Sequence, residues 1–352
     1  MWLLPGRAAL NQDVVRVGII ANPASGKDIR RLVGHATVVD NQGKVAIIRR
    51  VLIGLRALGV ERALIMPDTY HLGERAIDGL SYADQEAPAL ELVDMPVTGE
   101  PEDSEHAARL MAERGVRVVV VLGGDGTVRM VSKGAGNIPL LPLSTGTNNV
   151  LPTFVEGTVA GMAAAAVALH GIDAVRVSIR HKWLELLVNG ASVDGALVDM
   201  ATLAGRFVGA RAVWNAGDLR QVMVTRADPA SIGISAIAGA LHPVDPEEPL
   251  GVALQLSPQA RRRVLAAIGP GILAEVGVVS ASRLALGEAV AVVPERPILL
   301  AMDGERAVAL HEGEDAAVRL RDDGPWLLDP GLVMREVVAR GLLDRSPKDD
   351  AR

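Results

Sequence analysis

The sequence predicts an α/β half with a doubly wound parallel sheet, followed by a β-rich, antiparallel and sandwich-like half. Strand and helix patterns alternate over about the first 150 residues, and after about residue 174 the apolar period falls from 3.6 to 2. The chain has 352 residues, the length of about two ordinary domains. We therefore expect an α/β domain at residues 1–173 and a β-rich domain at residues 174–330. A closing helix at residues 331–343 would pack back on the first domain.

Short apolar runs predict the strands of the α/β half. The run from Val116 to Leu122 is the clearest, because it is β-branched and almost wholly apolar, as in a strand buried on both faces of a parallel sheet. The other expected strands are residues 14–21, 63–66, 91–95 and 139–143.

Helical patterns separate these strands. Apolar residues at helical spacing between residues 45 and 55 predict a helix that ends at Gly59, and Ser104 can cap a helix that runs to Arg114. After the valine-rich strand, residues 128–133 can form a helix that Gly134 closes. A further helix begins near Glu156, and its alanine-rich part is typical of close helix packing.

The second half carries strand and turn signals. Apolar and polar residues alternate at residues 175–180 and 252–256, and hairpin turns are expected at Asn189-Gly190, at Asp194-Gly195 and near Gly313. Ser257-Pro258 is typical of the start of a short helix.

Composition excludes several kinds of site. The chain has no cysteine, which excludes disulfides, zinc thiolate sites and cysteine nucleophiles. Its net charge of −6 argues weakly against a nucleic acid or a polybasic membrane partner. Residues 1–5 are too short for a signal-peptide core, and we find no apolar stretch long enough to span a bilayer. We therefore expect a cytoplasmic protein that binds neither nucleic acid nor a membrane.

The most informative motif is the run from Gly123 to Thr127, Gly-Gly-Asp-Gly-Thr, which directly follows the valine-rich strand. The glycines let backbone N–H groups approach a phosphate, and a helix N-terminus after a strand is a ready anion site. Asp125 adds one carboxylate that could take a proton. The alternative is a carboxylate that only caps the helix, worth about 1 kcal/mol.

Three further blocks lie where strands should end. Residues 22–27 resemble a phosphate loop but fail the Walker A pattern, because Asp28 stands where Ser or Thr is needed. Residues 144–149 supply hydroxyls and amides around one loop. Both blocks could be plain turns, but they gain weight because they should share the carboxyl edge of the sheet with Asp125. The fourth block, residues 302–305, is a hairpin turn when taken alone.

The order of these blocks resembles the superfamily of NAD kinases, diacylglycerol kinases and sphingosine kinases. Asn-Pro-x-Ser-Gly, Gly-Gly-Asp-Gly-Thr, Gly-Thr-x-Asn and Asp-Gly-Glu follow one another over nearly the whole chain. The chain is most similar to the ATP-NAD kinase family. Within it, residues 22–44 are similar to a branch encoded beside acetoin-catabolism genes.

Two stretches favour the NAD kinase side of this superfamily. Residues 196–199 match the Ala-Leu-Asn-Asp strand that faces the dinucleotide, except at Val198. Residues 232–239 stand where NAD kinases carry Thr-Gly-Ser-Thr-Ala-Tyr and a following Ser-Ala-Gly, but Ile237 replaces the aromatic ring. The substrate-binding residues that the resemblance implies are Asp199, Gly233, Ser235 and Ala236.

The resemblance implies phosphoryl transfer from ATP to a hydroxyl, with Mg²⁺ as cofactor. For an NAD kinase the acceptor is the adenosine ribose 2′-OH of NAD⁺, and Asp125 would take its proton. Asp303 and Glu305 could help to hold Mg²⁺. The nucleotide-binding residues implied are Asn22, Ser25, Gly26, Lys27, Gly123, Gly124, Gly126, Thr127, Gly146, Thr147, Asn148 and Asn149.

Several alternatives stay open at this point. The same loops suit a lipid or small-polyol kinase, and a catalytically silent nucleotide-binding protein would bind nucleotide without turnover. Inorganic polyphosphate could replace ATP as the donor. The resemblance also implies a homo-oligomer, a dimer or tetramer, built through strands of the β-rich half.

Overall fold

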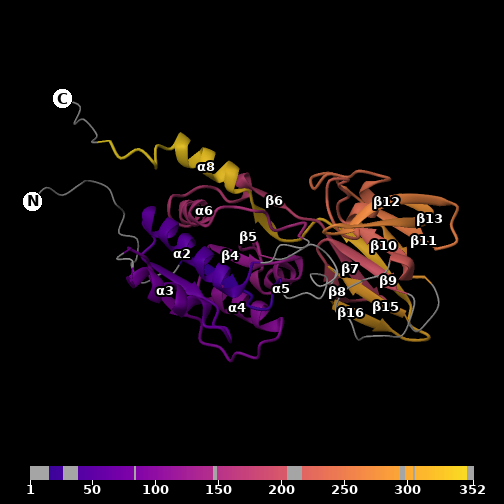
Figure 1. Cartoon of the computed structure of the whole chain (residues 1–352), viewed down its shortest axis with the longest axis horizontal. Coiled ribbons are helices and arrows are strands. Elements are labelled where there is room, and N and C mark those ends of the chain that lie inside the picture. Colours follow the sequence, from indigo (N-terminus) through magenta and orange to yellow (C-terminus); the bar gives the residue numbers. More distant parts are fainter. Residues whose placement is uncertain are drawn as a thin grey trace, which may run out of the picture.

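The computed structural model describes residues 16–26, 39–82, 85–145, 149–203, 216–293, 298–303 and 306–346. Its α/β part and its β-rich part lie side by side along the long axis of the molecule (Figure 1). The first prediction, an α/β region with a parallel sheet followed by an antiparallel β-rich region, is confirmed.

The first sheet has seven strands in the order β3-β2-β1-β4-β5-β18-β6. The first five in this order pair in parallel, as does β18 with β5, and β6 runs antiparallel to β18. The strands are β1 Val17–Ala21, β2 Arg62–Ile65, β3 Ala89–Leu92, β4 Val118–Gly123, β5 Leu140–Ser144, β6 Ser178–Arg180 and β18 Trp326–Leu328. β4 lies between two strands, and helices cover both faces of the sheet. It is therefore buried along its whole length, as its valine run predicts.

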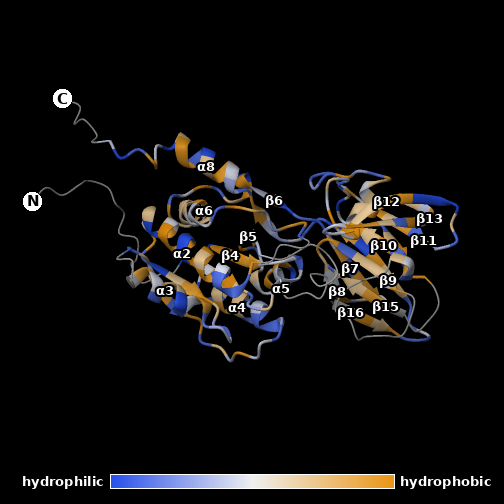
Figure 2. Cartoon of the chain, in the orientation of Figure 1, coloured by the Kyte–Doolittle hydropathy of each residue, from blue (hydrophilic) through white to orange (hydrophobic). Residues whose placement is uncertain are grey.

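Helices cover both faces of this sheet. One apolar cluster joins it to α2 Asn41–Ala57, α3 Leu72–Tyr82, α6 Gly157–Leu169 and α8 Pro330–Ala339. A second joins the opposite face to α4 Glu102–Glu113 and α5 Asp125–Ala135. Helix α8 lies beside α6 in Figure 1, and its Val333 and Val337 are fully buried. The apolar side chains therefore gather between the layers, and Figure 2 shows hydrophobic colours on the central strands around β4.

The β-rich part contains two antiparallel sheets. The larger has the order β12-β13-β11-β10-β9-β15-β16 and the smaller β14-β17-β7-β8. Side chains of both sheets form one apolar cluster, so they pack as a sandwich. The other face of the larger sheet is covered by the short helix α7 Ser235–Gly239. The strands are β7 Trp183–Val188, β8 Ala191–Ala196, β9 Asp199–Leu203, β10 Leu219–Val224, β11 Leu250–Leu256, β12 Arg262–Gly269, β13 Ile272–Ala285, β14 Ala289–Ala291, β15 Ile298–Met302, β16 Arg306–Leu310 and β17 Ala316–Arg321.

Several local expectations differ from the structure. Gly134 lies inside α5, and the residue that follows the helix with a positive φ of 60° is Gly136. Asp194-Gly195 lies within β8 rather than in a turn, whereas Asn189-Gly190 forms the β7–β8 turn as expected. Ser257-Pro258 opens a turn and no helix.

Two further expectations also differ. Residues 175–177 form a short 3₁₀ helix, η1, before β6. Ser104 lies inside α4, whose N-cap position is Pro101. In these cases the sequence pattern reflects neighbours along the chain, whereas the local structure depends on contacts with distant elements.

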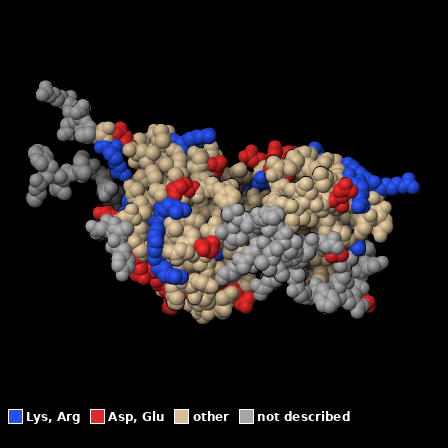
Figure 3. Space-filling model, in the orientation of Figure 1, with Lys and Arg blue, Asp and Glu red and all other residues tan. Residues whose placement is uncertain are grey.

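Both signs of charge occur on both parts of the molecular face that Figure 3 shows. Among the described residues, none of the helices is both long and apolar enough to cross a membrane.

Candidate functional site

The candidate site lies where the strand order of the first sheet reverses. From β1 the chain proceeds to β2 on one side, while β4 pairs with β1 on the other side. In open α/β sheets, ligands bind at such a switch point, outside the carboxyl ends of the strands. The loops after β1, β4 and β5 meet there, because Ala21 pairs with Leu122 and Gly123 pairs with Ser144.

Hydrogen bonds join the three loops. The side-chain amide of Asn22 donates to Thr127 Oγ1 at 3.0 Å, and the Ser25 and Thr145 hydroxyls are 3.0 Å apart. The Asn149 amide donates to Ser144 Oγ at 2.7 Å. Five expected nucleotide-site residues, Asn22, Ser25, Gly123, Thr127 and Asn149, therefore belong to one connected edge, as the sequence predicts.

Lys44 holds the loop after β1 in shape. This side chain is fully buried on α2, and its ammonium donates to the carbonyl oxygens of Asn22 at 2.9 Å and Ser25 at 2.8 Å. Longer bonds reach the Pro23 carbonyl and the Asn41 side chain. Gly26 closes the loop with a φ of 76°. Sequence reasoning missed Lys44, and its only signal was a lysine on the apolar face of a helix.

The N-terminus of α5 presents backbone donors to this edge. The helix begins at Asp125, and its N-cap residue, Gly124, makes no side-chain cap hydrogen bond. Val128 N–H donates to the Gly124 carbonyl, so the first three N–H groups, including those of Gly126 and Thr127, have no acceptor within the helix. A Cβ on Gly123 would meet Thr127, and one on Gly124 would lie 3.0 Å from Asn149 Oδ1. The motif therefore needs Gly123 for its own packing, and a side chain at Gly124 would press on Asn149.

Asp125 is nearly buried, with 8% of its surface exposed. Its carboxylate accepts the N–H of Val150 at 3.0 Å and that of Leu151 at 2.8 Å. Both donors lie in the loop after β5, so Asp125 also fixes that loop against α5. Asp125 thus bonds to a loop about 25 residues away in the chain, which is more than a carboxylate that only caps its own helix would do.

Some expected site residues fall outside the described part of the chain. These are Lys27, Gly146, Thr147, Asn148 and Glu305.

The segment from Leu197 to Asp199 lies close to this edge. Val198 is 1% exposed and belongs to the same apolar cluster as Leu151, which donates to Asp125. Asp199 begins β9 and is 7% exposed. Val198 thus fills an apolar space at the position where NAD kinases carry an asparagine amide.

The other expected substrate residues lie in a different environment. Ser235 and Ala236 begin α7, are almost fully buried, and pack on β11 and β12 in a separate apolar cluster. Gly233 has a φ of 111° and donates its N–H to the Ala267 carbonyl. Asp199 therefore follows a residue of the apolar cluster that contains Leu151, whereas Gly233, Ser235 and Ala236 lie beside β11 and β12.

Asp303 differs from the expectation of a metal ligand. Its side chain is fully buried and accepts the N–H groups of Leu197, Val198 and Asp199 at 2.7 to 3.3 Å. Arg129 Nε lies 3.4 Å from Asp303 Oδ2. Burial raises the pKa of Asp303, and the Arg129 charge opposes that shift. A carboxylate already used by three amides and a guanidinium does not fit the expected magnesium pair, and the described residues contain no group of three potential metal ligands.

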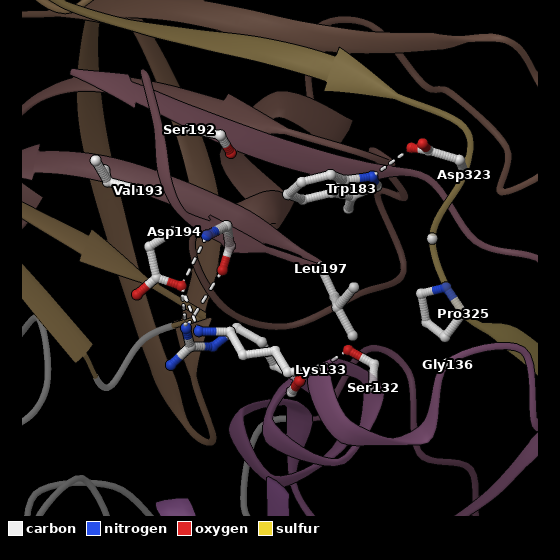
Figure 4. A pocket seen from close by; sticks show the side chains of 13 residues that line it. Ser132, Lys133, Gly136, Trp183, Ser192, Val193, Asp194, Leu197, Asp323 and Pro325 are labelled. Atoms are coloured by element: carbon white, nitrogen blue, oxygen red, sulfur yellow. Dashed lines mark hydrogen bonds and ion pairs between the residues drawn. The ribbon is translucent and has the colours of Figure 1, made fainter. Parts of the chain in front are cut away.

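Arg129 joins α5 to the β-rich part. Its Nη1 lies 3.3 Å from Asp194 Oδ1 and donates to the Gly195 carbonyl at 3.3 Å. Lys133, one turn later, reaches the same Asp194 oxygen at 2.5 Å (Figure 4). The pKa of Asp194 is lowered overall. Burial alone would raise this pKa, but the Lys133 hydrogen bond and the Arg129 charge outweigh that effect. We call Arg129, Lys133, Asp194 and Asp303 the junction network.

A pocket of about 380 Å³ lies beside this network. It is bounded by the C-terminal half of α5, by β7 and β8, and by residues 323–325 (Figure 4). Trp183 forms one wall, with its indole N–H bonded to Asp323 Oδ1 at 2.7 Å. None of its lining residues belongs to the three loops at the switch point.

Comparison with known proteins agrees with this arrangement. Residues 17–171 match the family model of the ATP-NAD kinase N-terminal domain, and residues 182–323 match that of the acetoin catabolism protein X C-terminal domain. Acetoin catabolism protein X of Cupriavidus necator is 37% identical over 344 residues, which cover 95% of this chain and 96% of that protein. The chain therefore belongs to the ATP-NAD kinase family, in the branch of acetoin catabolism protein X.

Proposed function

We propose that the protein transfers the γ-phosphoryl group of ATP to a hydroxyl, and that its acceptor is the adenosine ribose 2′-OH of NAD⁺. The observation that carries the proposal is the meeting of three loops and the N-terminus of α5 at the switch point, where Asp125 begins the helix. Its family membership supports a kinase-like function.

In this mechanism the chain mainly positions its substrates, as is usual for phosphoryl transfer. The N–H groups of α5 hold donor phosphates, and the Asn22–Gly26 loop and Asn149 complete the nucleotide site. Asp125 accepts the proton of the acceptor hydroxyl as its oxygen bonds to the γ-phosphorus and the bond to the leaving diphosphate breaks. The family implies a divalent metal with ATP, but Asp303 does not fit as its ligand, because its carboxylate already accepts three backbone N–H groups and pairs with Arg129.

A coupled assay tests this function. Purified protein, Mg-ATP and NAD⁺ are mixed, and NADP⁺ is read with an NADP-specific dehydrogenase. We expect turnover by the wild type and a loss of roughly 10²–10⁴-fold in Asp125→Asn, the usual contribution of a general base.

Asp103→Asn is a matched control for this assay. Asp103 is also 8% exposed and also fixes a loop, through the N–H groups of Thr98 and Gly99. Equal activity losses in the two variants would mean that Asp125 only holds its loop, which contradicts the catalytic role.

A second candidate is transfer to a different hydroxyl, such as that of a lipid or a small polyol. Burial of Val198 and Ile237 favours it, because both are apolar where a dinucleotide site would present polar groups. ATP binding without NADP⁺ formation would favour this candidate or a catalytically silent nucleotide-binding protein. Substitution of ATP by polyphosphate in the same assay tests the donor.

A further inference from the structure

Three basic side chains meet where the chain passes from the first sheet into the sandwich. His181 and Lys182 connect β6 to β7, and Arg226 follows β10. The charges of Arg226 and Lys182 both act on His181, so the three groups lie within electrostatic range of one another. We call these three residues the basic junction.

The members of the basic junction differ in how their donors are used. Lys182 is almost fully buried and donates to the carbonyls of Asp245 at 3.2 Å, Glu248 at 2.5 Å and Leu250 at 2.6 Å. Burial, with Arg226 as a further cause, lowers its pKa to about 8. His181 is buried and its pKa is lowered to about 3 by burial and by Arg226, so its ring is neutral. The ammonium of Lys182 therefore has a backbone carbonyl acceptor for each of its three N–H groups.

Arg226, by contrast, keeps most of its donors. Among the described residues, its Nη1 has one long hydrogen bond, 3.5 Å to the Val150 carbonyl, and its buried Nε has no acceptor. Within the described part of the chain, no carboxylate lies within ion-pair distance of this guanidinium. A half-buried guanidinium with unused donors is costly unless an anion completes it. His181 Nε2, also buried without a partner, adds a second unused polar atom to the same cluster.

The position of Arg226 connects this unused charge with the candidate site. Val150, whose carbonyl accepts from Arg226, donates its own N–H to Asp125 at 3.0 Å. Arg226 comes from the β-rich part, whereas the loops that would hold the donor nucleotide all come from the first sheet. An anion at Arg226 would therefore lie between the sandwich and the loop after β5 that Asp125 holds.

We propose that Arg226 binds a phosphate group that the acceptor substrate already carries. A guanidinium presents paired N–H donors that match phosphate oxygens. The inference rests on the proposed function in assigning the phosphate to an acceptor, and it defines the acceptor class as a phosphorylated or pyrophosphate-bearing alcohol. A neutral polyol or an uncharged lipid would leave this guanidinium without a counter-ion.

The test measures binding and needs no turnover. Calorimetric titrations with NAD⁺, with adenosine as its phosphate-free counterpart, with inorganic pyrophosphate and with ATP are made on the wild type and on Arg226→Ala and Arg226→Lys. We expect Arg226→Ala to weaken NAD⁺ and pyrophosphate binding by roughly 10-fold or more, the usual size of a charge-assisted hydrogen bond. Arg226→Lys should lose less, and adenosine and ATP affinities should stay unchanged.

Arg220→Ala is the matched control. Arg220 lies on β10, is also half-buried, and uses its Nη1 on the carbonyls of Gly217 and Leu219. It should keep wild-type affinity for all four ligands, and thermal unfolding of every variant checks that the fold is intact.

The outcomes separate this inference from the proposed function. Unchanged NAD⁺ and pyrophosphate affinity in Arg226→Ala overturns the inference, as does a wild type that binds neither ligand. A selective loss of ATP affinity overturns the assignment to the acceptor, because the phosphate then belongs to the donor. Arg226-dependent pyrophosphate binding without NADP⁺ formation supports the inference and contradicts NAD⁺ as the acceptor.

Discussion

Lys44 illustrates what a single side chain does at the candidate site. Its ammonium replaces water for three backbone carbonyls of the loop after β1, so the loop keeps its shape without secondary structure. The sequence motifs predict the loop residues themselves, because Asn, Ser and Gly at a strand end are recognisable. They do not predict Lys44, because its partners lie about 20 residues away and are main-chain atoms that any sequence would supply.

Replacement of Lys44 should weaken both the fold and nucleotide binding. Lys44→Met leaves the carbonyls of Asn22 and Ser25 without their donor, and an unsatisfied buried polar group costs about 1–3 kcal/mol. We expect a loss of about 2–5 kcal/mol in the free energy of unfolding, measured by urea denaturation.

Arg50→Met on the same helix is the control for Lys44→Met. Its ion pair with Glu156 is exposed, so about 1 kcal/mol or less should be lost. Equal losses in the two variants would show that the four contacts of Lys44 add nothing to stability.

At the scale of elements, α5 combines three tasks. It begins at Asp125, carries Arg129 and Lys133 into the junction network, and packs against α4. The sequence predicts a helix after the glycine motif, and the structure confirms one. The predicted end of the helix, Gly134, is wrong, because the helix continues to Ala135. In a single sequence, a glycine needed for close helix packing cannot be told from a glycine that ends a helix.

Gly134→Ala should separate the two helices. A Cβ at this position would meet the Glu105 carbonyl of α4, and backbone atoms cannot turn aside as a side chain can. We expect a loss of about 1–3 kcal/mol, despite the higher helix propensity of alanine, measured by chemical denaturation.

Gly79→Ala in α3 provides the comparison for Gly134→Ala. The three atoms nearest to an added methyl there all belong to the guanidinium end of Arg49, a side chain that can move where the α4 backbone cannot. Its stability should change little or rise. A Gly134→Ala variant as stable as Gly79→Ala would contradict the packing role of Gly134.

For the whole molecule, the junction network determines how the two parts are held. Arg129, Asp194 and Asp303 have side chains that are at most 6% exposed, and they come from α5, β8 and the β15–β16 turn. The sequence identified Asp303 as a candidate ligand because Asp-Gly-Glu completed a motif order. It could not show that Arg129 would be its partner, because that contact exists only once the two parts have packed together.

Arg129→Met should uncouple the two parts. Removal of one partner from a buried ion pair costs about 3–5 kcal/mol, because Asp194 and Asp303 remain buried without their guanidinium. We expect calorimetry to show a lower melting temperature and two transitions where the wild type shows one. Lys133→Met, which removes a side chain that is 31% exposed, should have a smaller effect, and equal effects would contradict this role of Arg129.

The return of the chain to its first sheet has a consequence for synthesis. Strand β18, at Trp326–Leu328, pairs with β5, at Leu140–Ser144, after the entire sandwich has been made. At roughly 5–20 residues per second, the ribosome needs about ten seconds or more to supply that strand. During this interval one edge of β5 stays open to pairing with another chain. A nascent chain of this protein is therefore most exposed to misassembly while the segment between β5 and β18 is being translated.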